Sequence, residues 1–230
     1  MSFKLSVEKK LKKDLLLSEA AEKAIMSFMN YQKNLDKQIE KLKSEELVPR
    51  LLLHSCCAPC SSYVLEYLHP YFDITVFYYN PNIFPEREYT KRLLEQQELI
   101  SAMKFSPPVS FLAGHYDRDQ FYEMAKGLEH LREGGERCLR CYEMRLKEAA
   151  EMAQKGEFDY FTTTLSISPM KNADRLNEIG MKLAKEYGVE YLQSDFKKRN
   201  GYKRSIELSK EYGLYRQDYC GCEFSQRRQV

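Results

Sequence analysis

The stretch "LLLHSCCAPC" (51–60) ends an apolar run with three cysteines within five positions, Cys56, Cys57 and Cys60. A short apolar run that stops at turn-forming residues is typical of a strand buried in a parallel sheet. Packing alone does not explain the cysteines, because Val or Ala would fill a core without the reactivity of a thiol. We therefore predict a buried strand over 50–54 and a chemical role for the thiols that follow it.

The composition indicates one soluble globular protein. The chain has 230 residues, of which 43% are hydrophobic and 30% are charged, and this length can bury one good-sized core. No segment approaches the roughly 20 apolar residues that span a bilayer, and the lysine-containing start lacks the apolar region of a signal peptide. We expect a cytoplasmic protein without a membrane partner.

Charge and cysteine content narrow the function. The net charge is +2, so any surface for RNA has to be a local patch. Seven cysteines are an odd number, and the cytosol keeps ordinary thiols reduced. Metal binding or redox chemistry is therefore a better explanation for the cysteines than a framework of structural disulfides.

Strand-like and helix-like segments alternate from residue 50 onward. The expected strands are 50–54, 72–79, 109–114, 159–165 and 189–193. The expected helices are 61–70 with Ser61 or Ser62 as its N-cap, 85–104, a helix from Asp117, 138–155, 172–187 and 201–212. This alternation predicts an α/β fold with a mostly parallel sheet flanked by helices on both faces.

The first 49 residues differ from the rest, because they contain neither Cys nor Gly and end at Pro49. Their apolar residues recur at helical spacing: Ile25, Phe28, Met29, Leu35, Ile39 and Leu42. This pattern indicates a helical face. We predict a helical N-terminal extension (1–49) that packs on a catalytic domain (50–230), and we favour a packing role over a partner-binding arm.

Four unusual loops follow the expected strands, and ligands of such sheets bind beyond the carboxyl ends of the strands. These loops are rich in polar, basic or sulfur-containing residues and cover 55–60, 78–82, 166–172 and 194–204. The sequence therefore predicts one site at this edge of the sheet.

The seven cysteines fall into three tight groups: Cys56, Cys57 and Cys60; Cys138 and Cys141; and Cys220 and Cys222. The groups are much farther apart than the roughly 15–20 residues between the pairs of a zinc ribbon, so the fold must bring them together. Four thiolates complete either a [4Fe–4S] cluster or a closed zinc site. The other three suggest a mononuclear metal with an open position or a redox-active thiol pair.

Five ordered motifs carry a resemblance to a known family. They are "HSCCAPC" (54–60), "FYYNPNIFPEREYTKR" (77–92), "GERCLRCYEMRL" (135–146), "FTTTLSISPMKN" (161–172) and "GLYRQDYCGCEFS" (213–225). Over about residues 50–226, the chain resembles the cobalamin-independent epoxyqueuosine reductase family, QueH. The resemblance implies a Rossmann-like fold of the adenine-nucleotide-hydrolase kind. It also implies an enzyme that reduces the epoxide of epoxyqueuosine at the wobble position of tRNA, the last step of queuosine biosynthesis.

The resemblance also implies roles for the cysteines. Cys56, Cys57, Cys138 and Cys141 would bind a [4Fe–4S] cluster. Cys220 and Cys222 would form a redox-active pair, able to close a disulfide bond, or bind an adjacent mononuclear metal, iron or zinc. Cys60 stands where family members can carry Asp, and it fits the second metal. Cobalamin is not expected, and the electron donor would be a protein such as a ferredoxin or flavodoxin.

Removing an epoxide oxygen as water takes two electrons and two protons. The candidate proton donors are His54, Tyr78, Tyr79 and Asp218. Proteins read single-stranded RNA with aromatic and cationic side chains. The candidate tRNA contacts are Tyr78, Tyr79, Asn80, Lys171, Asn172, Lys197, Lys198, Arg199 and Arg204, extended by Arg216, Arg227 and Arg228. His115 and His130 have no companion at ligand spacing and are interpreted as ordinary residues.

Two other functions fit parts of the pattern. One is an ATP-dependent tRNA sulfurtransferase, but the first loop lacks the glycine-rich phosphate cradle that this chemistry needs. The other is a zinc-stabilised RNA-binding module without catalytic activity.

Overall fold

The computed structural model describes residues 30–225. Five parallel strands form one sheet in the order β3-β2-β1-β4-β5. The strands are β1 (Arg50–His54), β2 (Asp73–Tyr78), β3 (Ser110–Ala113), β4 (Tyr160–Thr163) and β5 (Glu190–Tyr191). The predicted α/β class is confirmed, while the closer likeness to adenine-nucleotide hydrolases stays a prediction.

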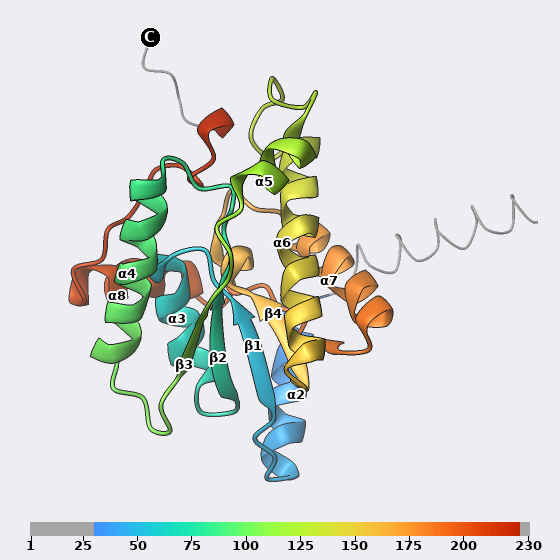
Figure 1. The fold of residues 1–230 in the computed structure, drawn as a ribbon. Coiled ribbons are helices and arrows are strands. Elements are labelled where there is room, and N and C mark those ends of the chain that lie inside the picture. The colour runs from blue at the N-terminus through green and yellow to red at the C-terminus, as the bar shows by residue number, and fades with distance from the viewer. Residues whose placement is uncertain (1–29, 226–230) are drawn as a thin grey trace, which may run out of the picture. The chain divides into compact units, whose positions relative to one another are not determined.

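Seven α-helices occur within residues 30–225. They are α2 (Tyr31–Ser44), α3 (Ala58–Leu68), α4 (Glu86–Ala102), α5 (Arg118–Ala125), α6 (Glu136–Lys155), α7 (Ala173–Tyr187) and α8 (Gly201–Glu211). Helices α6 and α7 cover one face of the sheet, and α3 and α4 cover the other, with α8 packed against α3 (Figure 1). None of these helices is long and apolar enough to span a bilayer.

Strand β1 is buried on both faces, which explains its unbroken apolar run. Leu51 and Leu53 belong to the core beneath α3, and Leu52 belongs to the core beneath α6. All three are fully buried, and burying a leucine side chain contributes roughly 1.5–3 kcal/mol. A strand of this kind is fixed in the centre of the sheet, because either face would lose its core if the strand moved to an edge.

Helix α2 adds part of the predicted N-terminal extension to the same core. Leu35, Ile39 and Leu42 are buried in the cluster that contains Leu51 and Leu53. Ile25, Phe28 and Met29 lie outside the described residues. The division of the chain at residue 49 stays a prediction.

Of the expected boundaries that differ from the structure, two bear on the site. Helix α3 begins at Ala58 with Cys57 as its N-cap, because Pro59 suits the first turn of a helix, so Ser61 and Ser62 are not caps. Both serine hydroxyls instead bond to backbone carbonyls of the preceding turn. The strand expected over 159–165 ends at Thr163, whose hydroxyl accepts a hydrogen bond from the backbone N–H of Leu165 and starts a 3-10 turn, η1 (Thr164–Ile167).

His54, at the carboxyl end of β1, joins the two neighbouring strands. Its Nε2 lies 3.1 Å from the carbonyl oxygen of Tyr79, and its Nδ1 lies 2.8 Å from Thr163 Oγ1. A carbonyl can only accept, so Nε2 carries the proton and Nδ1 accepts from the threonine hydroxyl. Burial, and then the nearby charge of Arg145, lower the pKa of His54 to about 3. The ring is neutral and fully engaged, which leaves it no free nitrogen to serve as the expected proton donor.

We predict that His54 makes the protein less stable in acid. Below a pH of about 6.5, His54 binds a proton in the unfolded chain. In the folded chain it stays neutral until the pH approaches its lowered pKa of about 3. The free energy of unfolding therefore falls as the pH falls from about 6.5 toward 3. The slope from this group approaches roughly 1.4 kcal/mol per pH unit. Urea unfolding between about pH 6.5 and 4 should show a shallower slope for His54→Gln than for the wild type. His115→Gln, at an exposed position, controls for the loss of an imidazole, and an unchanged slope in His54→Gln would contradict the prediction.

Candidate metal and redox site

The first cysteine group forms where β1 turns into α3. The Sγ atoms of Cys56, Cys57 and Cys60 all lie within 4.8 Å of one another, and those of Cys56 and Cys57 are 3.7 Å apart. The geometry is local, because the N-cap residue and the third residue of a helix face each other. Three thiols at this spacing can bind one metal ion.

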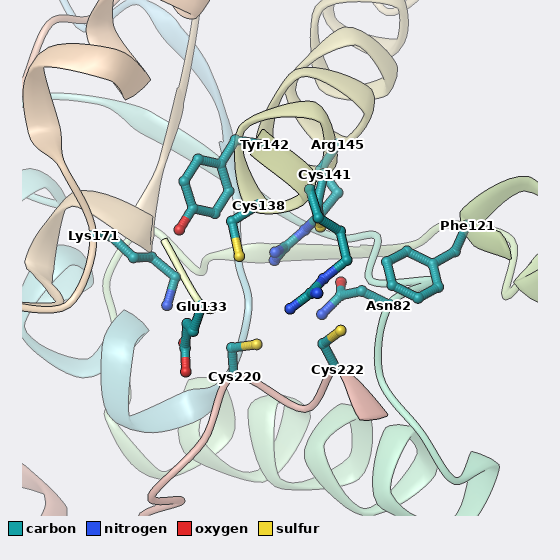
Figure 2. Close-up of a pocket in the computed structure, with 11 residues that line it drawn as sticks. Asn82, Phe121, Glu133, Cys138, Cys141, Tyr142, Arg145, Lys171, Cys220 and Cys222 are labelled. Atoms are coloured by element: carbon teal, nitrogen blue, oxygen red, sulfur yellow. The ribbon is translucent and has the colours of Figure 1, made fainter. Parts of the chain in front are cut away.

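The second group joins α6 to the C-terminal loop. Cys138 and Cys141 are one helical turn apart and share a face of α6, and they line a pocket with Cys220 and Cys222. Figure 2 shows the sulfur of Cys138 on one side of this pocket and those of Cys220 and Cys222 on the other. The fold therefore brings together cysteine pairs that are far apart in the sequence. All seven thiols are free, and no disulfide is formed.

Lys171 is a cation that acts on both sets of thiols, the triad after β1 and the four cysteines of the pocket. The thiols of Cys57 and Cys60 donate to Cys56, and Lys171 adds to their effect, so the pKa of Cys56 is well below its usual value. A hydrogen bond from Cys222, helped by Lys171, lowers the pKa of Cys220 in the same way. Burial alone would lower the pKa of Lys171, but the charges of Cys56 and Cys220 prevail and raise it. Lys171 therefore favours ionisation of Cys56 and Cys220, and the ionised thiols in turn favour the protonated form of Lys171.

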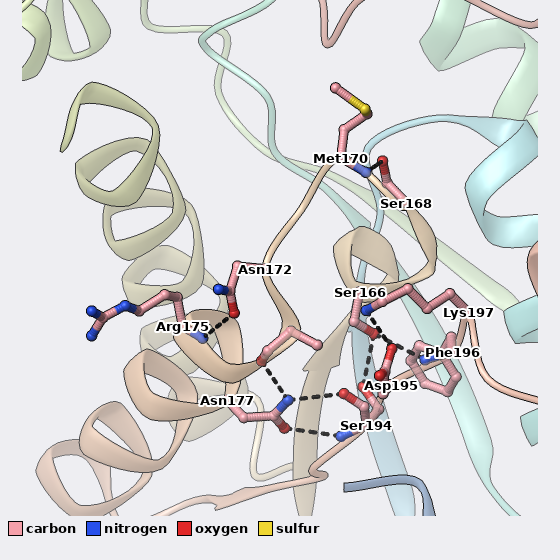
Figure 3. A network of polar contacts seen from close by, with 11 residues as sticks. Ser166, Ser168, Met170, Asn172, Arg175, Asn177, Ser194, Asp195, Phe196 and Lys197 are labelled. Atoms are coloured by element: carbon pink, nitrogen blue, oxygen red, sulfur yellow. Dashed lines mark hydrogen bonds and ion pairs between the residues drawn. The ribbon is translucent and has the colours of Figure 1, made fainter. Parts of the chain in front are cut away.

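The loop that carries Lys171 is held by polar contacts between neighbouring loops (Figure 3). The side-chain amide of Asn177 donates to the carbonyl of Ser194 and accepts from its backbone N–H, both at 2.9 Å. The hydroxyls of Ser166 and Ser194 lie 3.2 Å apart. These contacts fasten η1 and α7, the two elements on either side of Lys171, to the loop after β5.

Three contacts position the loop that carries Cys220 and Cys222. Arg92 Nη1 donates to the carbonyl of Cys220 at 3.3 Å, and the N–H of Phe84 donates to the carbonyl of Gly221 at 2.9 Å. Arg137 Nη2 donates to the carbonyl of Phe224 at 3.4 Å. Gly221 has a φ of +96°, and a Cβ there would lie 2.9 Å from Ile83 Cγ1. Only glycine fits without moving the cysteines on either side.

The sequence interpretation missed a set of buried polar groups around the cysteines. Arg137 and Arg145 are 1% and 2% exposed, line the same pocket, and have no carboxylate partner among residues 30–225. Asn82 is also buried, and its Oδ1 has no hydrogen-bond partner in that range. Their position in the sequence could have identified the two arginines, because they flank Cys138 and Cys141 on α6.

Several predicted substrate contacts are instead buried inside the fold. Tyr78, Tyr79 and Asn80 are at most 2% exposed. Tyr78 donates to the carbonyl of Tyr89, and Tyr79 donates to Gln120, while burial raises the pKa of both tyrosines. The Asn80 amide accepts from Arg145 and donates to the carbonyl of Ser55 at 2.9 Å. Direct contact with RNA would require these groups to leave the core.

The predicted basic segment is largely neutralised. Lys197 pairs with Asp195 at 2.5 Å, and Arg199 pairs with Asp36 at 2.5 Å. Arg204 pairs with Glu66 at 2.6 Å.

The other predicted contacts vary in accessibility. Asn172 is the N-cap of α7, where its side chain accepts from the N–H of Arg175 (Figure 3). Lys198 and Asp218 are exposed, and Arg216, also exposed, donates to Ser209 Oγ. Arg227 and Arg228 lie outside the described residues.

The fold and the site together define an α/β protein with a cysteine-lined centre able to bind metal. Residues 51–228 match the family model described as "Epoxyqueuosine reductase QueH". A protein of that name from Staphylococcus epidermidis is 44% identical over 205 residues, covering 87% of this chain and 86% of the relative. Those from Streptococcus pyogenes and Thermotoga maritima are 42% and 38% identical, covering 87% and 76% of this chain and 80% and 89% of the relatives. The chain belongs to the epoxyqueuosine reductase QueH family, as the motifs predicted.

We predict that Gly221→Ala lowers the metal content of the purified protein. The added Cβ must displace Ile83 or the loop, and a left-handed alanine costs roughly 1–2 kcal/mol, so Cys220 and Cys222 move. Gly213→Ala is the matched control, because Gly213 has a φ of +63° but open space around its Cα. Elemental analysis should find metal reduced in Gly221→Ala alone, and full occupancy there would contradict the positioning role of Gly221.

Proposed function

We propose that this protein is an epoxyqueuosine reductase, which removes the epoxide oxygen of epoxyqueuosine at the tRNA wobble position as water and leaves queuosine. The supporting observation is the convergence of all three cysteine groups around Lys171 in a member of a family with this name. The substrate is a tRNA that carries epoxyqueuosine in its anticodon loop. The two electrons come from a donor protein such as a ferredoxin or flavodoxin.

The residues fit the [4Fe–4S] cluster that the family resemblance implies. Such clusters are held by four thiolates, and this site offers seven thiols. Two of the groups lie at the start of a helix, Cys57 at α3 and Cys138 at α6, where the helix dipole favours the negative charge of a thiolate-ligated cluster. Without a metal, the hydrogen bond to Cys56 raises the pKa of Cys57, and burial raises the pKa of Cys138. The Gly134 N–H donates to Cys138 Sγ at 3.3 Å, a contact of the kind that stabilises a sulfur ligand.

We assign Cys56, Cys57, Cys138 and Cys141 to the cluster. Cys60, Cys220 and Cys222 would then bind an adjacent mononuclear iron or zinc, or act as a redox-active pair with Cys60 nearby. The spacing in the structure also suits a second division, with Cys138, Cys141, Cys220 and Cys222 on the cluster and the triad of Cys56, Cys57 and Cys60 on the second metal. Both divisions include Cys138 and Cys141.

The chain's own groups contribute charge and shape to the reaction. When bound, the cluster supplies electrons one at a time. The ammonium of Lys171 lies beside both thiol groups, where it can stabilise the negative charge that develops on the departing oxygen. Opening the ring breaks both C–O bonds, forms one C=C bond and consumes two electrons and two protons. The exposed Asp218, two residues before Cys220, remains as the predicted proton donor that is open to solvent.

The test is direct conversion of the substrate. Anaerobically purified protein, given a strong reductant and tRNA that contains epoxyqueuosine, should yield queuosine in the digested nucleosides. The protein should be brown and contain iron and sulfide. An intact cluster and sufficient reductant with unchanged epoxide would rule out the reductase, and a colourless protein with zinc and no iron would favour the RNA-binding module.

Cys138→Ala should abolish cluster loading, since Cys138 is a ligand in both divisions. Arg140→Gln is the matched control, because Arg140 lies between Cys138 and Cys141 on α6 but is exposed and pairs with Glu136. Iron and sulfide analysis should show loss in Cys138→Ala and wild-type content in the control. Wild-type iron content in Cys138→Ala would remove this residue from the ligand set.

A further inference from the structure

Arg145 places an uncompensated positive charge against the cysteine pocket. Its side chain extends from α6 one turn after Cys141, on the same face of the helix, and both residues line the pocket (Figure 2). Arg145 is only 2% exposed. Solvent therefore screens this charge poorly.

The one carboxylate among the described side chains that line the pocket, Glu133, makes no ion pair with Arg145. The hydrogen-bond acceptor of Arg145 is the neutral amide of Asn80, and no ion pair within residues 30–225 includes this arginine. Arg92, which is equally buried, has Glu88 at 2.7 Å. A buried guanidinium without a partner is costly, so the negative charge that balances Arg145 has to come from the pocket.

Asn80 fixes the guanidinium in place and connects it to the other cysteine group. Asn80 is fully buried, accepts from Arg145 Nη2, and donates to the carbonyl of Ser55, which immediately precedes Cys56. Ser55 in turn donates to Gln96 at 2.7 Å. The charge is therefore held rigidly between the turn after β1 and the cysteines of α6.

We propose that Arg145 is a positioning residue that sets the reduction potential of the site. A fixed, buried positive charge beside the thiolates stabilises the form with one more electron, so it raises the potential. The net charge around a cluster is one of the main determinants of its potential. This inference rests on the cluster of the proposed function, and it holds for either division of the cysteines because both assign Cys141 to the cluster.

The experiment is redox titration of the purified, cluster-loaded protein, followed by visible absorbance and electron paramagnetic resonance. Arg145→Gln removes the charge and leaves a shorter, neutral side chain. It should lower the midpoint potential by at least 59 mV, a tenfold change in the ratio of oxidised to reduced cluster for one electron. Arg145→Lys keeps the charge and should restore most of the potential.

Two further variants separate a local charge effect from a structural one. Arg140→Gln removes a charge from the same helix at an exposed position, with 53% of the side chain accessible, and should shift the potential far less than Arg145→Gln. Asn80→Asp is isosteric and gives Arg145 a carboxylate partner, so it should lower the potential in the same direction as Arg145→Gln.

Each outcome decides the proposal. Equal potentials in Arg145→Gln and Arg140→Gln, or a potential that does not fall in Asn80→Asp, would overturn it. The proposal would also be overturned if the variants at Arg145 and Asn80 folded but failed to load a cluster. Arg145 would then be needed for assembly of the cluster. If the cluster-loaded wild type leaves the epoxide intact, the proposed function is refuted but the role of Arg145 is not. If Arg145→Gln is active and its potential is unshifted, only the role of Arg145 is refuted.

Discussion

The parallel pairing of β1 with both β2 and β4 is the constraint on which the site depends. His54 is in register with Phe77 of β2 and with Thr163 of β4, so the three strands end at the same level. The loops that follow them then meet at one edge, which is the switch point of such a sheet. A slip of one residue in β1 would turn Leu51 and Leu53 toward the opposite core. The same burial that stabilises the sheet therefore fixes the position of the cysteines.

The charges around the pocket explain why thiols belong there. Arg137, Arg145 and Lys171 face it with a single carboxylate, Glu133, and this frame is positive before any thiol ionises. Four thiolates around a divalent metal carry net negative charge, and so does a thiolate-ligated cluster. A protein that leaves buried cations without counter-ions is less stable when the pocket is empty, so binding of the proposed cluster or metal would be coupled to folding in this region.

The sequence predicted the strand and helix order because the signals were strong and local. The leucines of β1, the amphipathic α4 and the cysteine spacing on α6 need no knowledge of distant residues. The partners of the basic segment could not be predicted, because Asp36 and Glu66 are more than 100 residues away from Arg199 and Arg204. The burial of Tyr78 and Asn80 was missed for a similar reason, since the residues that cover the end of a strand come from other elements.

The missed arginines show which part of a site a motif can reveal. The spacing of Arg145 from Cys141 places both on one helical face, and that much can be predicted from the chain. Whether the guanidinium meets a carboxylate depends on what α6 packs against, and here it meets Asn80 from the loop after β2. Cys56, near the start of the domain's sequence, and Cys220, near its end, both act electrostatically on Lys171. The charge balance of the centre is thus a property of the whole folded sheet edge, and it is complete only when the first strand and the C-terminal loop are both in place.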